Sequence, residues 1–212
     1  MRLNRPVHPR PVTDRKPSPA TRRKRTDEGA SGTAGRQLVL RLRYCPGESF
    51  PSYVDRLARL YKTTTRIMLV RLGLGAFASS KSRNHYGVHL DQFLVHQVAF
   101  ICGLSISQVE DMLFANYIAP IIDEKARDYL AGDKIAVGKA ASMTWTYFKG
   151  SHICPYCLRE TDGVWLNKWK LPWSFACVEH QCLLVDCCPR CSQRPRAGRT
   201  KTLMPPHVHR LS

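Results

Sequence analysis

Two pairs of metal-binding residues lie close together in the C-terminal half of the chain. Cys154 and Cys157 form a CxxC pair, and after nineteen intervening residues Cys177 and His180 form a CxxH pair. Three thiolates and one imidazole suit tetrahedral zinc, whose structural sites are closed by four protein ligands. In an intracellular protein, paired cysteines are also more typical of metal ligation than of disulfides. The spacing therefore predicts that these four residues bind Zn²⁺.

A third pair follows closely and indicates a second zinc position or a rearranged first one. Cys188 and Cys191 repeat the CxxC spacing. The later candidates for completing this position are His207 and His209, because two histidines in an HxH strand point to one side. Cys187 could replace Cys188 as a ligand.

The other cysteines are predicted to bind no metal. Cys182 is a spare thiol beside these pairs, whereas Cys45 and Cys102 stand alone in apolar stretches and are expected to be free and buried. A redox-active CxxC would need a single pair in a thioredoxin-like βαβ pattern, which is absent. No cysteine nucleophile with a His/Asn partner, phosphate-binding loop or nuclease-type carboxylate cluster is recognisable. We therefore predict no catalytic residue and no enzyme.

The composition limits the class of protein. The chain has 212 residues, with 33 Lys and Arg against 16 Asp and Glu, so its net charge of +17 implies a polyanionic partner, most commonly nucleic acid. Hydrophobic residues make up 43 % of the chain, which allows a packed core. No run approaches the roughly 20 apolar residues of a membrane span, and the first residues lack the apolar segment of a secretion signal. We expect a cytoplasmic protein with no membrane partner.

The charge is concentrated in two tails. Residues 1–36 contain ten Lys or Arg, three acids, five Pro and no aromatic residue, which predicts a disordered basic extension. Residues 192–212 are similar and contain no acid, so they form a second basic tail. Between the tails we expect a helical domain over 37–132 and a zinc-binding domain, of zinc-ribbon or zinc-finger type, over 133–191.

Helical periodicity and capping residues predict several helices before Gly132. Ser49 can cap a helix that has Pro51 in its first turn. Residues 63–65 are all Thr and can cap a second helix, which Gly73 would end. A third helix carries an apolar stripe from Leu90 to Ile101. The loop over 78–88 reads as polar and basic.

A helix-turn-helix is predicted over residues 95–114. Two helices that cross at a tight turn need a small residue at the crossing, a residue that tolerates positive φ at the turn, and apolar residues that lock the second helix. A capping box made by Ser105 with Gln108, or by Ser107 with Glu110, would start the second helix. The residues assigned to the motif are Ala99, Gly103, Leu104, Ser105, Val109 and Met112.

The second helix of this motif is poorly suited to reading bases. A base-reading helix presents Arg, Lys, Asn or Gln to the major groove, whereas this one carries Glu110 and Asp111 and no Lys or Arg. We therefore favour helix packing or protein docking over direct base reading. Nonspecific phosphate contacts are expected from basic residues elsewhere, namely Arg22, Arg23, Lys24, Arg25, Lys62, Arg66, Lys81 and Arg83. For residues 22–25 the alternative is a solvated basic tail.

Taken together, these motifs resemble the TniQ/TnsD family of transposition target-selection proteins. The likeness runs from the Pro46-Gly47-Glu48-Ser49 segment, through the Gly103 turn, to the spaced Cys, His, Trp, Pro and Leu-Leu pattern of 154–191. The resemblance implies a non-catalytic adaptor with an N-terminal helix-turn-helix and zinc-binding modules. Such adaptors bind a target marker, either a DNA site or a CRISPR effector with its guide RNA and target DNA, and recruit an AAA+ ATPase that passes the site to the transposase.

This chain is most similar to the short TniQ proteins that cap ATPase filaments or work with RNA-guided effectors, which would place it at the bacterial nucleoid. Its basic N-terminal extension is not part of the family pattern. The alternative is a zinc-containing helix-turn-helix transcription regulator. A regulator would normally dimerise to meet symmetric half-sites in DNA, so a monomer without sequence preference would favour the adaptor.

Overall fold

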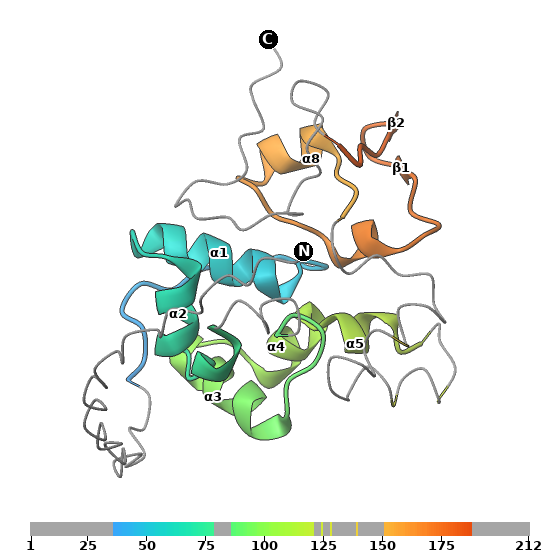
Figure 1. The fold of residues 1–212 in the computed structure, drawn as a ribbon. Helices are drawn as coiled ribbons and strands as arrows, with labels where there is room; N and C mark the ends of the chain where they lie inside the picture. Colours follow the sequence, from blue (N-terminus) through green and yellow to red (C-terminus); the bar gives the residue numbers. More distant parts are fainter. Residues whose placement is uncertain are drawn as a thin grey trace, which may run out of the picture. The chain divides into compact units, whose positions relative to one another are not determined.

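The structure is a computed structural model of the chain, and it describes residues 36–78, 86–120 and 151–187 together with positions 124, 128 and 139. All of these belong to one compact unit, residues 34–212. The described part is mainly helical and ends in a small region that contains a two-stranded sheet, which confirms the predicted fold class (Figure 1). The expected tails and the boundaries at 132 and 191 lie outside the described residues.

Six α-helices, two short 3-10 helices and two strands follow one another along the described residues. They are α1 (Phe50–Leu60), α2 (Thr65–Arg71), η1 (Gly75–Ala78), α3 (Gln92–Cys102), α4 (Ile106–Met112), α5 (Phe114–Ile118), α8 (Pro155–Glu160), η2 (Asn167–Lys170), β1 (Ala176–Cys177) and β2 (Cys182–Leu183).

The first helices begin where the sequence predicts. Ser49 has extended backbone as the N-cap of α1, and Pro51 lies in the first turn. The hydroxyl of Thr64 accepts a hydrogen bond from the N–H of Ile67 and so caps α2. The carboxylate of Asp91 accepts from the N–H of Leu94 at 2.8 Å and caps α3. The caps at Thr64 and Asp91 each satisfy a backbone donor that the helix itself leaves without a partner.

The predicted turn between α3 and α4 is present, and it bends the two helices by 112°. Gly103 has the left-handed φ of 66° that ends α3, and a Cβ at this position would lie 2.8 Å from the guanidinium of Arg41. Of the two predicted capping boxes, the structure contains the one made by Ser105 and Gln108. That this pair of helices acts on DNA as a helix-turn-helix stays a prediction.

The main core lies between α1, α2, α3 and α4. The motif residues Ala99, Val109 and Met112 are buried in it, and Leu104 packs against its edge. Among the described residues no single helix is long and apolar enough to cross a membrane, and only α3 and α4 taken together, across their bend, pass that test.

One part of the segment predicted to be a polar loop is instead buried. Tyr86 and Val88 belong to the core, and a Cβ at Gly87 would lie 2.3 Å from Cγ of Pro51. The carbonyl of Gly87 accepts a hydrogen bond from the N–H of Phe114, which helps to start α5. The prediction was wrong because three residues are too few to show a periodic apolar pattern.

A buried carboxylate lies where the helical part meets the later chain. The side chain of Glu48 is fully buried just before α1. It accepts hydrogen bonds from Arg56 at 2.6 Å and from the hydroxyl of Ser52 at 2.7 Å. The same hydroxyl accepts from the backbone N–H of Trp165 at 2.9 Å. A charge inside the fold therefore connects the start of α1 to a residue much later in the chain.

Backbone hydrogen bonds complete this junction. The N–H of Ser49 donates to the carbonyl of Trp165 at 2.8 Å, and the N–H of Asn167 donates to the carbonyl of Gly47 at 2.9 Å. The buried side chain of Asn167 also donates to the carbonyl of Met112, at the end of α4. Residues 165–167 are thus held against both α1 and α4.

Replacing Arg56 with Met should destabilise the protein by about 3 to 5 kcal/mol, because it leaves the buried Glu48 carboxylate without its cation. The matched control is Arg59→Met, one turn further along α1. Arg59 pairs with the carboxylate of Asp162, which is 93 % exposed, so its loss should cost less than about 1 kcal/mol. Urea unfolding measures both values, and equal effects would contradict a central role for the buried pair.

Candidate metal centre

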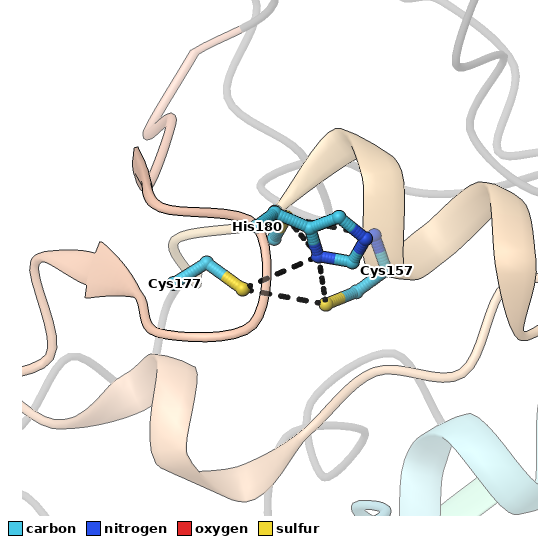
Figure 2. Close-up of side chains that lie close together, drawn as sticks. Cys157, Cys177 and His180 are labelled. Atoms are coloured by element: carbon cyan, nitrogen blue, oxygen red, sulfur yellow. Dashed lines mark hydrogen bonds between the residues drawn. The ribbon is translucent and has the colours of Figure 1, made fainter.

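Four side chains converge between α8 and the β1–β2 hairpin. Cys154 is the N-cap of α8, Cys157 lies in its first turn, Cys177 ends β1, and His180 lies in the hairpin loop. One donor atom from each residue lies within 4.8 Å of the donor atoms of the other three. Figure 2 shows the Nδ1 atom of His180 directed at the sulfurs of Cys157 and Cys177. The structure thus brings together the four ligands predicted from the spacing.

The distances between the donor atoms match a tetrahedral metal site. Zinc–sulfur bonds of about 2.3 Å and zinc–nitrogen bonds of about 2.0–2.1 Å give tetrahedral edges of about 3.8 Å between sulfurs and about 3.5 Å between sulfur and nitrogen. The Sγ atoms of Cys157 and Cys177 are 3.6 Å apart, and Nδ1 of His180 lies 3.3–3.6 Å from the three sulfurs. The cluster could therefore hold a metal ion, and its donor set is compatible with zinc.

Local structure explains why these side chains meet. Pro155 occupies the first turn of α8, and Sγ of Cys154 accepts a hydrogen bond from the N–H of Cys157 at 3.5 Å. In the hairpin, Cys177 pairs with Cys182 across the strands, and Gln181 takes a left-handed φ of 48° in the loop between them. A helix N-terminus and a tight hairpin therefore each contribute one pair of ligands.

Without a metal, the pKa values of the ligands are shifted in different directions. Burial raises the pKa of the Cys157 thiol above its usual range. Burial also opposes ionisation of Cys177, but hydrogen bonds from His180 and from the other thiols lower the pKa of Cys177 to about 7. A hydrogen bond with Glu160, and then one with Cys177, raises the pKa of His180 to about 9. Metal ligation needs thiolates and a neutral imidazole, so loading the site releases protons.

Glu160 holds the imidazole in place. Its Oε1 atom lies 3.0 Å from Nε2 of His180, and the ring of Tyr156 stacks on the imidazole at 5.4 Å between centroids. A proton on Nε2 donated to the carboxylate leaves Nδ1 free to face the metal. Glu160 was not predicted from the sequence, although its position three residues after Cys157 puts both on one face of α8.

Apolar side chains pack against the cluster. Trp165 and Trp169 are buried beside it, with their rings 6.1 Å apart in an edge-to-face arrangement. Trp173 and Phe175 are exposed. A turn follows at Leu171, whose carbonyl accepts a hydrogen bond from the N–H of Ser174.

The other predicted residues lie apart from this cluster or outside the described residues. Lys62 and Arg66 are exposed around the start of α2. Cys102 is buried as expected, but Cys45 is only half-buried, because it lies beside the guanidinium of Arg56 at the edge of the core. Residues outside the described part are Arg22, Arg23, Lys24, Arg25, Lys81, Arg83, Cys188, Cys191, His207 and His209.

These features define a class of protein in which a small helical domain carries a Cys/His module that could hold a metal ion, with hydrogen bonds from residues 165–167 joining the two. A comparison with family models matches TniQ over residues 39–184, which spans both the helical part and the four-residue cluster. The chain belongs to the TniQ family and is therefore related to transposition. No curated protein gives a significant match to it.

Replacing Cys154 with Ser should lower the zinc content of the native protein from about one ion per chain to a small fraction of that value. Loss of Cys154 removes a buried thiolate ligand and the N-cap of α8 together, and metal binding is coupled to folding. Elemental analysis measures the zinc, and tryptophan fluorescence should report disturbance around Trp165 and Trp169. Cys45→Ser is the control and should be nearly silent. Equal damage from both variants would mean that the ligands are misassigned.

Replacing Glu160 with Ala should weaken zinc binding about 10- to 100-fold, since partners of a ligating histidine commonly contribute this much. Glu160→Gln keeps an acceptor for the Nε2 proton and should fall between Ala and the wild type. Competition with a chromogenic chelator measures the affinities. Asp162→Asn changes an exposed carboxylate two residues later and should have no effect; unchanged affinity in Glu160→Ala would contradict the orienting role.

Proposed function

We propose that the protein is a non-catalytic adaptor in the selection of transposition target sites. It joins an AAA+ ATPase filament to a target-marking complex, such as a CRISPR effector with its guide RNA and target DNA. The TniQ match over residues 39–184 supports a role in transposition. The zinc ion bound by Cys154, Cys157, Cys177 and His180 has a structural role, because all four positions of a tetrahedral site are filled by the protein.

The charge on α4 is the observation that favours docking over base reading. This helix, Ile106–Met112, contains no Lys or Arg. The carboxylate of Glu110 accepts a hydrogen bond from Gln92 at 3.2 Å, and that of Asp111 accepts from the hydroxyl of Tyr44 at 3.4 Å. These contacts keep two negative charges at the helix that would enter the groove. Approach of DNA phosphates to this helix is therefore unfavourable.

Exposed basic side chains elsewhere suit nonspecific contact with phosphates. Lys62 follows α1, while Arg66 and Arg71 are exposed on α2. They carry no sequence information, because phosphates are the same at every base pair. Their role is to hold the adaptor near DNA or guide RNA while protein contacts determine its place.

A group of exposed apolar side chains is the proposed docking surface for the partner protein. This hairpin surface consists of Trp173, Phe175, Val178 and Leu183, with exposed fractions of 50 %, 68 %, 86 % and 72 %. Side chains of this kind are concentrated at the centres of protein interfaces. The metal ligands Cys177 and His180 lie in the same hairpin and hold it against α8, so the surface is presented on a fixed support.

The double variant Val178→Ser/Leu183→Ser should retain zinc and weaken binding to the AAA+ ATPase of the same transposon by about tenfold or more, as loss of interface anchors does. Co-sedimentation with ATPase filaments assembled on DNA measures the binding. The matched control is Phe93→Ser/Phe100→Ser, which removes two exposed apolar side chains from α3. If only the α3 variant loses binding, the hairpin surface is not the docking site.

Binding to DNA alone separates the adaptor from the alternative, a zinc-containing helix-turn-helix regulator. The adaptor should bind duplexes weakly and without sequence preference, with log K falling by about 0.9 per log salt for each neutralised phosphate. Selection of one duplex by a factor of about 1,000 or more at physiological salt would instead support the regulator.

A further inference from the structure

A fifth potential metal ligand lies beside the four that form the cluster. Cys182 was taken from the sequence as a spare thiol, but its Sγ atom is 3.7 Å from Sγ of Cys154. It is not one of the four residues whose donor atoms all lie within 4.8 Å of one another. The hairpin and α8 together therefore present five donors to an ion that takes four.

The distance to Cys154 is that of two sulfurs on one metal. A tetrahedral zinc site has sulfur–sulfur edges of about 3.8 Å. Cys157 and Cys177, which belong to the cluster, are 3.6 Å apart, so the 3.7 Å between Cys182 and Cys154 falls in the same range. Cys182 can share an ion with Cys154 while Cys154 stays in place as the N-cap of α8.

The hairpin directs this thiol to the side of the metal. Cys177 and Cys182 are directly opposite each other in the antiparallel pair. Opposite residues in such a pair have side chains on the same face of the sheet, and Cys177 faces the cluster. Cys182 therefore points to the same side as an established member of the ligand set.

His180 is the ligand that a fifth donor can most easily replace. Cys154, Cys157 and Cys177 are buried, whereas the His180 side chain is partly exposed and is held on its outer side by Glu160 and Tyr156. Both of these residues are largely exposed. Thiolate is also the softer ligand, which zinc accepts as readily as imidazole.

We propose that Cys182 is a reserve ligand, which completes a four-cysteine site when His180 leaves the metal. In this exchange the bond to Nδ1 of His180 breaks, the bond to Sγ of Cys182 forms, and the thiol proton of Cys182 passes to solvent. No electrons are transferred. Thiolate replaces a neutral ring at the metal, so the ion with its four ligands becomes one charge unit more negative, and the ring of His180 is released in the hairpin loop. The inference rests on the proposed zinc site.

The test compares His180→Ala, Cys182→Ser and the double variant in the full-length protein. Zinc content is measured by elemental analysis, and the number of thiolates by the charge-transfer absorption of the cobalt(II)-loaded protein. His180→Ala should retain about one zinc and show stronger thiolate absorption than the wild type. Cys182→Ser should leave both values unchanged. The double variant should bind zinc at least about tenfold more weakly than His180→Ala, because it lacks both His180 and its proposed replacement Cys182.

The matched control is Cys187→Ser in the His180→Ala background, which removes another half-buried thiol of the same region and should keep the zinc. If His180→Ala loses as much zinc as the double variant, or shows no additional thiolate, Cys182 is not a reserve ligand while the zinc site stands. If the untreated wild type contains no zinc, the proposed site fails and the inference fails with it.

Discussion

The buried carboxylate of Glu48 is the charge on which the described part of the chain depends. A carboxylate without contact to water is costly unless it is paired and hydrogen-bonded. Ser52 and Arg56 meet that need from about one turn and two turns further along the chain. Because the Ser52 hydroxyl also accepts from the N–H of Trp165, the group that bonds the carboxylate also bonds the region that carries the Cys/His cluster. The buried charge and the contact between the two regions therefore share one side chain.

The metal-binding region has little regular structure of its own. Its two strands contain two residues each, and its helix α8 has only six. Regions of this size need a metal, a disulfide or a larger neighbour to stay folded. The Cys/His cluster can hold α8 to the hairpin, and the junction at residues 165–167 holds the region to α1. The Cys/His cluster and the hydrogen bonds to α1 therefore act on the same short stretch of chain.

Features that depend on neighbouring residues could be predicted from the sequence. The caps at Thr64 and Ser105 each bind a backbone N–H three residues later, and the CxxC and CxxH pairs follow the same short spacing. Contacts between distant residues could not. Cys182 meets Cys154 across a separation of 28 residues, and nothing in the adjacent sequence indicates that contact. Burial of Tyr86 and Val88 likewise depends on Pro51 and on α5.

The hydrogen bond between Ser52 and Trp165 joins residues 113 positions apart, and this separation affects the order of folding. During synthesis the helices α1 to α4 emerge from the ribosome well before Trp165. Chain closure over such a length is slow compared with local helix formation. The nascent helical core must therefore exist for several seconds, at typical rates of about 5–20 residues per second, with its Glu48 carboxylate accessible to water. In that interval the surface later covered by Trp165 is open to chaperones and proteases.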